Sequence, residues 1–237
     1  MTYKLTNTSQ PADPYYGAVS LLLHGDGADG STQIIDSSPR TKTVTAVGNA
    51  QISTTESKFN GSSLKFDGTG DYLGLGVNNP DYAFGSGDFT VEGWVYPIDT
   101  SASVFFGGQS DLATKSGSSY GFFLYPSGDG TSLYIGSGNK SINSPNPPIN
   151  QWSHVAFVRN GTNFTSFLNG TIVSTRADIG TSAVNVGSVT YQATIGAFPN
   201  GSNDFNGYID DFRITKGVAR YTSNFTPPTQ PFQSLAA

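Results

Sequence analysis

The chain has 237 residues, of which 12% are charged, and a formal net charge of −5. A soluble domain usually carries about 25% charged residues, so this surface consists largely of Ser, Thr, Asn, Gly and Tyr, which favour turns and strands. The composition excludes a helix bundle. With only 12 Lys and Arg and no basic run, the chain also lacks the positive surface that binds nucleic acid.

Two further features limit how the chain works. No apolar run approaches the roughly 18 residues of a membrane-spanning helix, and the opening residues lack the cationic and apolar stretches of a signal peptide. We therefore expect neither membrane insertion nor a cleaved leader. The chain has no cysteine, which excludes disulfides, thiolate metal sites and thiol catalysis.

Short runs of β-forming residues separated by Gly, Asn, Asp and Pro extend along the whole chain, and no longer stretch has an apolar period of 3.6 residues. The pattern predicts an all-β protein with very little helix. The expected strands, in chain order, are Val19–Leu23, Thr43–Val47, Ser63–Phe66, Phe89–Tyr96, Val104–Phe106, Gly121–Tyr125, Leu133–Ile135, His154–Arg159, Thr165–Leu168, Ile172–Thr175, Ala193–Ile195 and Gly207–Ile214.

Two local patterns are the most definite. In the strand Phe89–Tyr96, alternation puts Phe89, Val91 and Val95 on one face and the polar and larger aromatic residues on the other. In FTSFLNGTIVST, the pair Asn169–Gly170 supplies the two positive φ angles of a type I′ turn. We expect a tight hairpin at this pair.

We expect one folded domain, residues 18–225, between an N-terminal arm of residues 1–17 and a C-terminal arm of residues 226–237. The arms have too little apolar content to form core, so we expect them to dock on other subunits. Residues 139–151 are rich in Asn, Pro and Ser and are expected to form a long loop. Trp94 and Trp152 are expected to lie in the core.

Five blocks together resemble one family: LLLHGDGADGSTQIIDSS, SSLKFDGTGDYL, DFTVEGWVYP, WSHVAFVRNGTNFTSFLNG and GYIDDFRITKGVARYTSNFTPP. In this order, they resemble a laminin-G-like domain of the concanavalin A-like lectin/glucanase superfamily. The resemblance implies a jelly-roll β-sandwich of two antiparallel sheets. The first and last blocks are similar to forms common in structural proteins of tailed bacteriophages, an association that implies a place in a virion.

Catalytic patterns are missing from the sequence. Glucanases of this superfamily carry two glutamates and an aspartate on one strand, because retaining hydrolysis needs an acid and a nucleophile about 5 Å apart. This chain has only Glu56 and Glu92, far apart in sequence. The two histidines, His24 and His154, have no nucleophile motif beside them and are expected to be structural. We therefore expect no enzymatic activity.

A structural calcium site is one interpretation of the aspartates beside Gly-rich turns, because their oxygens suit a hard cation. Relatives in the resembled superfamily often carry such an ion. The candidate ligands are Asp26 and Asp210. Three partners for a buried Asp210 remain open at this stage: a calcium ion shared with Asp26, an arginine such as Arg213 or Arg159, or backbone N–H groups of the opening turn.

Strict alternation along Gly207–Ile214 places Asp210 on the same face as Tyr208 and Phe212. Asp211 falls on the other face, with Arg213. We therefore expect Asp210 to be the half-buried member of the pair, and its replacement to destabilise the protein far more than that of Asp211.

The first functional hypothesis is a non-catalytic virion protein of a bacteriophage, part of the capsid decoration, tail or fibre. It would lie at the virion surface, contact other virion proteins and copies of itself, and bind host surface polysaccharide. The alternative is a free-standing, secreted lectin that binds glycans through loops rich in Asn, Asp and Tyr. The candidate ligand residues are Asp71, Tyr72, Tyr120 and Asn139. A glycoside hydrolase is the remote alternative.

Overall fold

The computed structural model describes residues 12–101, 103–108, 119–124, 132–136, 138–141, 145–177, 180–187 and 191–234 of the chain. In 119–120, 123, 132–136 and 138–141 the description covers the backbone alone. No helix in these residues is long and apolar enough to span a membrane.

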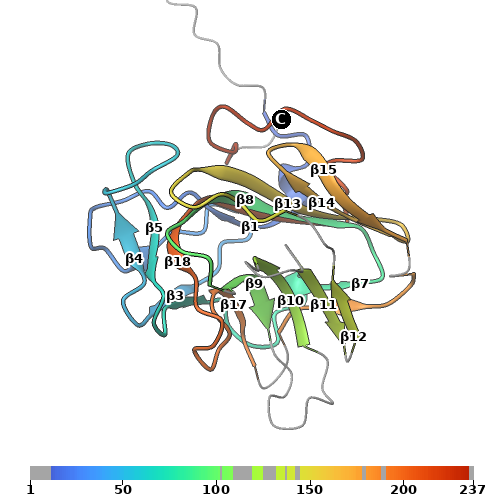
Figure 1. Cartoon of the computed structure of the whole chain (residues 1–237), viewed down its shortest axis with the longest axis horizontal. Coiled ribbons are helices and arrows are strands. Elements are labelled where there is room, and N and C mark those ends of the chain that lie inside the picture. Colours follow the sequence, from blue (N-terminus) through green and yellow to red (C-terminus); the bar gives the residue numbers. More distant parts are fainter. Residues whose placement is uncertain are drawn as a thin grey trace, which may run out of the picture.

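The first of two large sheets pairs its strands antiparallel in the order β15, β14, β13, β8, β18, β5, β4, and β1 also pairs with β18. Its strands are β1 (Val19–Leu23), β4 (Gln51–Ser53), β5 (Ser63–Asp67), β8 (Phe89–Pro97), β13 (Ser153–Asn160), β14 (Asn163–Leu168), β15 (Thr171–Arg176) and β18 (Asn206–Lys216). The central strands are β8, β13 and β18, which Figure 1 shows above the second sheet.

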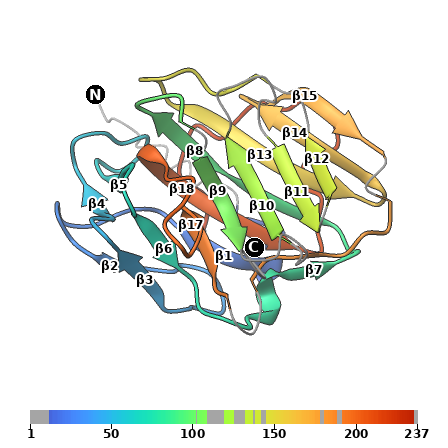
Figure 2. The same cartoon turned by 60° about the horizontal axis from the view of Figure 1, so that its bottom comes forward.

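The second sheet has the order β12, β11, β10, β9, β17, β6, β3, β2 and is also antiparallel. It faces the viewer in Figure 2, with the first sheet behind. Its strands are β2 (Gln33–Ile34), β3 (Val44–Val47), β6 (Tyr72–Gly74), β9 (Ser103–Gly108), β10 (Ser119–Leu124), β11 (Ser132–Gly136), β12 (Gly138–Ser141) and β17 (Ala193–Gly196). A small pair, β7 (Ala83–Gly85) with β16 (Val184–Asn185), and two 3₁₀ turns, η1 (Tyr16–Ala18) and η2 (Pro80–Tyr82), complete the described elements. The predicted all-β jelly-roll sandwich is confirmed.

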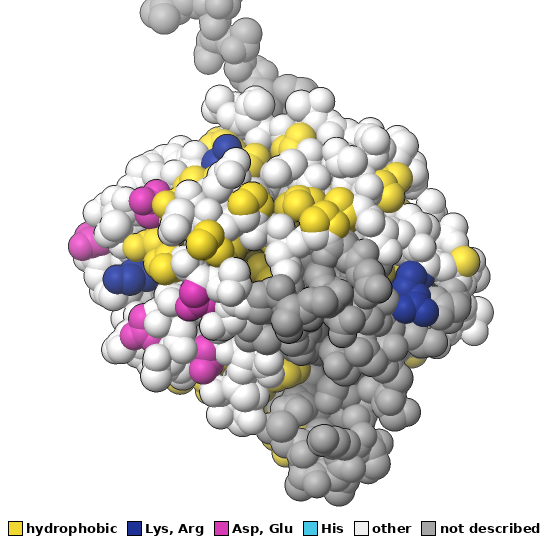
Figure 3. Space-filling model, in the orientation of Figure 1, with side chains coloured by type: hydrophobic (Ala, Val, Ile, Leu, Met, Phe, Trp, Pro, Cys, Tyr) yellow, Lys and Arg dark blue, Asp and Glu magenta, His cyan; other side chains and the backbone are white. Residues whose placement is uncertain are grey.

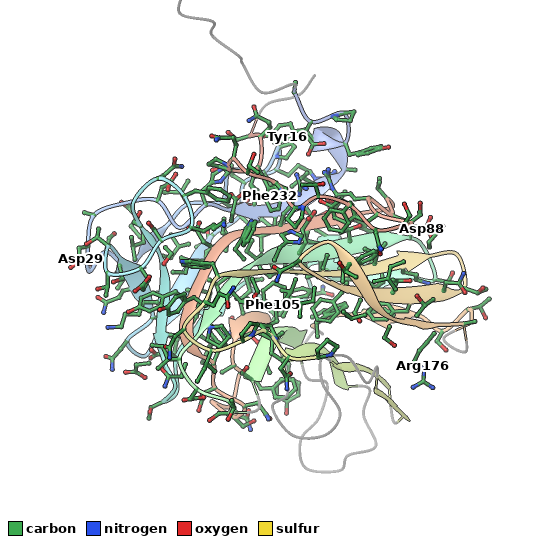
Figure 4. The ribbon with its side chains drawn as sticks, turned by 45° about the horizontal axis from the view of Figure 1, so that its top comes forward. Tyr16, Asp29, Asp88, Phe105, Arg176 and Phe232 are labelled. Carbon is green, nitrogen blue, oxygen red and sulfur yellow. The ribbon has the colours of Figure 1, made fainter. Side chains whose placement is uncertain are left out.

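Phenylalanine rings fill the space between the sheets. Phe105 and Phe106 from β9 contact Phe212 of β18, with ring centroids 5.0 and 6.0 Å apart, and Phe122 of β10 contacts Phe157 of β13. Figure 4 shows Phe105 between the two layers. The inward side chains of β8 are Phe89, Val91 and Val95, as alternation predicted. These aromatic contacts hold the two sheets face to face.

The predicted hairpin is confirmed at Asn169–Gly170, where φ is 49° and 77°, and Leu168 pairs with Thr171 across the turn. A side chain at position 170 would also collide with the carbonyl oxygen of Phe225, whose amide donates to the carbonyl of Gly170. Glycine is therefore required for the turn and for the close approach of the C-terminal segment.

Two expectations about the loops and core were wrong. Strand β12 occupies Gly138–Ser141, so the expected loop over 139–151 begins later, because Asn and Lys in this strand pair with β11 through the backbone alone. Trp94 is buried, but it lies on the outer face of the first sheet, against Phe59 and His154. Trp152 is half-buried beside Tyr96. Neither tryptophan belongs to the core between the sheets.

Both terminal segments pack on the outer face of the first sheet. Phe232 is only 4% exposed and packs against Val19 and Leu22 with the partly buried Tyr16. Figure 4 shows Tyr16 and Phe232 on the side of this sheet away from Phe105. The expectation that the arms contribute no buried apolar residue is therefore wrong for Phe232. One isolated aromatic among polar residues gives no periodic signal, yet it fills a specific site here.

Candidate functional site

The first sheet forks at the middle of β18. Residues 206–209 of this strand pair with β5, whereas residues 212–215 pair with β1. Between them the pairing with β8 is irregular, and Asp211 has a φ of 52°, a conformation that Asp tolerates better than most residues. This β-bulge places Asp210 and Asp211 where one neighbouring strand ends and the other begins.

The bulge changes which residues share a face. Ile209, Phe212 and Ile214 all belong to the core between the sheets, so Phe212 and Ile214 do not share a face with Tyr208 and Asp210, as strict alternation required. Asp210 and Asp211 are both buried, at 1% and 0% exposure. The prediction that Asp210 is much more buried than Asp211 is therefore wrong, because one extra residue shifts the alternation.

Each aspartate has its own set of partners. Asp210 Oδ2 accepts hydrogen bonds from the amides of Lys58 and Phe59, at 2.8 and 3.0 Å. Asp211 accepts from His24 Nδ1, at 2.6 Å, and from the amide of Phe232. Backbone N–H groups are thus the observed partners of Asp210, but they come from the turn before β5 and not from the opening turn that the sequence pointed to.

The pKa values of Asp210 and His24 are both raised above their ordinary values. Burial is the main cause that raises the pKa of Asp210 to about 7; the hydrogen bonds from the amides of Phe59 and Lys58 oppose this rise, and the negative charges of Asp211 and Asp26 add to it. Burial lowers the pKa of His24, but the hydrogen bond to Asp211 and the charges of the three aspartates outweigh this effect, so this pKa is raised. The negative charges of Asp26 and Asp211 therefore contribute to the raised pKa of both Asp210 and His24.

A pocket of about 340 Å³ opens beside this group, and we call it the fork pocket. His24 and Asp26 come from the turn after β1, and Asn60 comes from the turn before β5. The C-terminal segment supplies the opposite wall, with Gln230, Pro231, Phe232, Gln233 and Ser234. A second hollow continues on the other side of His24 and Asp26, against Ile34, Ile35 and Ile52. The fork pocket thus combines charged, amide and aromatic groups.

The carboxylate oxygens in this region do not fit a calcium site. Asp210 Oδ2 and Asp211 already accept N–H groups, and Asp26 Oδ2 accepts from the amide of Asn60. Calcium needs six to eight oxygen ligands, and the described residues contain no group of three His, Cys, Asp or Glu placed to hold a metal. Asp26 and Asp210 are close enough to interact electrostatically.

The four predicted ligand residues do not form one site. Asp71 is fully buried and accepts hydrogen bonds from the amides of Asn49 and Asp67, so it stabilises a turn and cannot meet a ligand. Tyr72 is half-buried in β6. Tyr120 lies in β10 and Asn139 in β12 of the same sheet, and their side chains are outside the described residues. Strands β10 and β12 are both separated from β6 by β9 and β17.

Glu92 is part of a buried ion-pair network on the outer face of the first sheet. Arg213 donates to it from Nε and Nη2, at 3.0 and 2.8 Å, and Tyr221 donates at 2.8 Å. His154 Nε2 lies 3.3 Å from its other oxygen. Burial alone raises the pKa of Glu92, but the charge of Arg213 and the contact with His154 outweigh it and hold this pKa well below its usual range.

Sequence reasoning missed two parts of the fork pocket. It treated His24 as purely structural, although His24 lines the pocket, and it placed residues 226–237 outside the domain, although Gln230 and Phe232 form one wall. The signal for His24 is its position directly after a strand and before a Gly-rich turn, where a side chain reaches the sheet edge. No signal in the sequence joins the C-terminal segment to that turn.

Comparison with known proteins identifies the family. A family model described as the concanavalin A-like lectin/glucanases superfamily matches residues 67–220, more than half of the chain. The chain belongs to this superfamily. This superfamily member has a lectin-like fold, which confirms the resemblance that the five sequence blocks suggested. No curated protein sequence matches the chain.

Solved structures show the same fold at low identity. Domain 4 of AbnA, a GH43 extracellular arabinanase from Geobacillus stearothermophilus solved with arabinotriose, has a TM-score of 0.60 and 22% identity over 85% of this chain and 93% of that one. The binding domain of Paraclostridial Mosquitocidal Protein 1 has a TM-score of 0.62 and 13% identity over 86% of this chain and 50% of that one. The botulinum neurotoxin serotype D binding domain has a TM-score of 0.60 and 16% identity over 86% of this chain and 49% of that one. This superfamily member spans about half the length of the two toxin domains.

Proposed function

We propose that the chain is a non-catalytic carbohydrate-binding module and that the fork pocket holds the sugar. The observation that carries the proposal is the lining of this pocket. Sugar hydroxyls need donors and acceptors together, and His24, Asp26 and Asn60 supply both. The half-buried Pro231 adds an apolar surface for the C–H groups of a sugar ring. A concave site with a few convergent polar groups is a typical ligand site.

The carboxylates support binding over catalysis. Glycoside hydrolysis requires two carboxyl groups that reach the substrate. Asp26 is exposed at the fork pocket, but Asp210 is only 1% exposed beneath it, and Glu92 is fully buried against Arg213. Glu56, the second glutamate, lies in the turn before β5, where its carbonyl accepts from Ser63. The described residues therefore offer no pair of accessible carboxyl groups at the pocket.

Two similar structures support carbohydrate as the ligand class. The AbnA domain was solved with arabinotriose, and a binding domain of botulinum neurotoxin DC was solved in complex with SialylT. Those ligands belong to those proteins. They make a glycan array, rather than a peptide or nucleotide screen, the first experiment for this chain.

The test is a glycan array with matched variants. Asn60 has a φ of 54°, so Asn60→Gly removes the amide without backbone strain. We expect it to weaken oligosaccharide binding about tenfold, through the loss of one hydrogen bond. The control is Asn203→Gly, because Asn203 also has a positive φ, of 59°, and does not line the pocket. Absence of glycan binding by the wild type would contradict the proposed function, as would release of reducing sugar from a bound glycan.

We further propose that the module works at the surface of a bacteriophage particle, next to other virion proteins and copies of itself. The support is the resemblance of HGDGADGST and ITKGVARYTSNFTPP, at the two ends of the domain, to phage structural proteins. Detection of the chain by mass spectrometry in purified particles tests this part. A monomer found only in the medium and binding glycans would instead support the secreted lectin.

A further inference from the structure

A row of large side chains crosses the outer face of the first sheet at one end. Tyr208 of β18 lies directly opposite Lys65 of β5 and Tyr96 of β8. The Tyr96 ring lies 5.9 Å from that of Tyr208 and 5.5 Å from that of Trp152. On the far side of Lys65, the opposite residue is Gln51 of β4. Because paired residues share a face, these five side chains form one line, which we call the aromatic row.

The aromatic row faces away from the core. Its neighbours along the strands, Leu64, Val95 and Ile209, belong to the core between the sheets. Tyr208 is largely covered, whereas Tyr96 and Trp152 are half-buried. Figure 3 shows hydrophobic side chains gathered in a band that begins on the β4 and β5 side of the molecule and runs toward its centre, with Lys or Arg at that side. The row thus presents aromatic surface to solvent.

Two lysines beside the row, Lys58 and Lys65, form no ion pair within 4.0 Å among the described residues, although Lys58 is close enough to Asp210 for an electrostatic interaction. Lys58 Nζ lies 3.9 Å from the ring centroid of Trp94, and Lys65 stands in the row itself. Elsewhere in the described residues, the ammonium of Lys42 and the guanidinium groups of Arg40, Arg213 and Arg220 lie within 4.0 Å of carboxylates. Lys58 and Lys65 therefore place two ammonium groups beside the aromatic side chains of this end of the sheet.

We propose that the aromatic row binds an acidic polysaccharide, a chain whose sugar units carry carboxylates. Sugar rings stack on Tyr96 and Trp152, and the carboxylates pair with Lys65 and Lys58. Asp67, two residues beyond Lys65, does not pair with this lysine; its oxygens accept from the amide of Thr69 and the side chain of Asn49. The row spans five strand positions, which suits a chain of several sugar units better than a single sugar.

The row continues toward the fork pocket. Lys58 and Phe59 cover Trp94, the neighbour of Tyr96 one row away, and Asn60 of the same turn lines the fork pocket. One long polymer can therefore contact both surfaces. This inference rests on the proposed function, since it names the ligand class and a second contact surface for the same module.

Affinity electrophoresis in gels containing polygalacturonate, alginate, dextran or arabinan tests the inference. We expect the two uronate polymers to retard the wild type, and retardation to decrease as salt is added. Lys65→Gln should weaken uronate binding about tenfold, and Trp152→Ala should weaken it similarly. The matched controls are Lys216→Gln, at the other end of β18, and Tyr72→Ala, on the second sheet. Circular dichroism and melting temperature verify that each variant folds.

The outcomes separate this inference from the proposed function. Retention of uronate binding in Lys65→Gln and Trp152→Ala, with loss in Asn60→Gly, would contradict binding at the aromatic row. The module would remain a carbohydrate binder. Retardation by dextran or arabinan alone would contradict the inference that the ligand is an acidic polysaccharide. Loss in the row variants with normal binding of short neutral oligosaccharides would support the row. A wild type that binds neither array glycans nor any of the four polymers would contradict both proposals.

Discussion

Two groups of buried charge lie on the outer face of the first sheet and behave in opposite ways. Around Glu92, the partners are Arg213 and the other cations, and the pKa of the carboxyl is held low. Around Asp210, the partners are two amides and neighbouring carboxylates, and its pKa rises to about 7. Burial is nearly complete in both cases. The partners, not the depth, decide whether a buried acid stays charged at neutral pH.

This difference suggests different roles. An ion-paired network such as that of Glu92 fixes one arrangement of the sheet and of the segments that cover it, which include Asp13 and Tyr221. The second group consists of His24, Asp26, Asp210 and Asp211, and we call it the fork group. The pKa of Asp210 lies near neutral pH, and His24 and Asp26 line the fork pocket. Perturbed acid groups beside a pocket are candidates for function.

The largest expected effect comes from breaking the paired network. Arg213→Met leaves Glu92 buried without its main cation, and we expect a loss of about 3–5 kcal/mol in the free energy of unfolding, measured with urea. Arg40→Met is the control, because the Arg40–Asp81 pair is exposed at the arginine and is worth about 0–1 kcal/mol. Equal losses in the two variants would show that the Glu92 network is not effectively buried.

The fork group should make stability depend on pH in the opposite sense from an ordinary surface acid. The pKa of Asp210 is higher in the folded chain, about 7, than its ordinary value of 3.8. The folded state therefore binds more protons, so stability is greatest below pH 4 for this group and falls as the pH rises to about 7. The difference is at most about 4 kcal/mol.

Urea unfolding of the wild type and of Asp210→Asn between pH 4 and pH 8 measures this effect. The amide oxygen of Asn still accepts from Lys58 and Phe59, so the variant should lose the decline with pH and keep its fold. The raised pKa of His24 adds a loss of the same sign as the pH rises through its folded value. A wild type that gains stability between pH 4 and pH 7 relative to Asp210→Asn would contradict the charge assignment at the fork.

The bulge predicts that the two neighbouring aspartates matter about equally. Asp211→Ala removes the acceptor of His24 and Phe232 and places Ala at a φ of 52°. We expect it to lower the free energy of unfolding by about 2–3 kcal/mol, as much as Asp210→Ala does. Melting temperatures of the two variants measure this. A large loss for Asp210→Ala with none for Asp211→Ala would favour the regular strand that alternation predicted.

The smallest expected effect is that of chelation. Because N–H groups bind Asp210 Oδ2 and both oxygens of Asp211, we expect EDTA to leave the melting temperature of the wild type unchanged. Calcium added back should also have no effect. A drop in melting temperature that Asp26→Asn abolishes would restore the calcium site and overturn the hydrogen-bonded assignment.

Local patterns in the sequence predicted local structure well. The turn at Asn169–Gly170 and the inward residues of β8 depend on two to eight neighbouring residues, so they were correct. The faces of β18 were wrong from Asp211 onward, because one residue with positive φ shifts every later side chain. The fork that causes the bulge joins residues 19–23, 63–67 and 206–216, and that pairing has no local signature.

The candidate site was predictable only in part. Alternation correctly put Asp210 on the face of Tyr208, and composition drew attention to Asp26. The pocket wall formed by Phe232 was not predictable, because a single aromatic in a polar tail has no period. Asp71 was misassigned as a ligand residue because a turn Asp that is buried and one that is exposed have the same sequence context.

The central position of β18 also has a consequence for synthesis of the chain. Strands β1, β5 and β8 all pair with β18, yet β18 begins only at Asn206. At about 5–20 residues per second, the ribosome makes β8 many seconds before its partner emerges. During that time the backbone edges of β5 and β8 that later face β18 stay open to wrong partners. The nascent chain therefore depends on late, long-range pairing, which slows its folding.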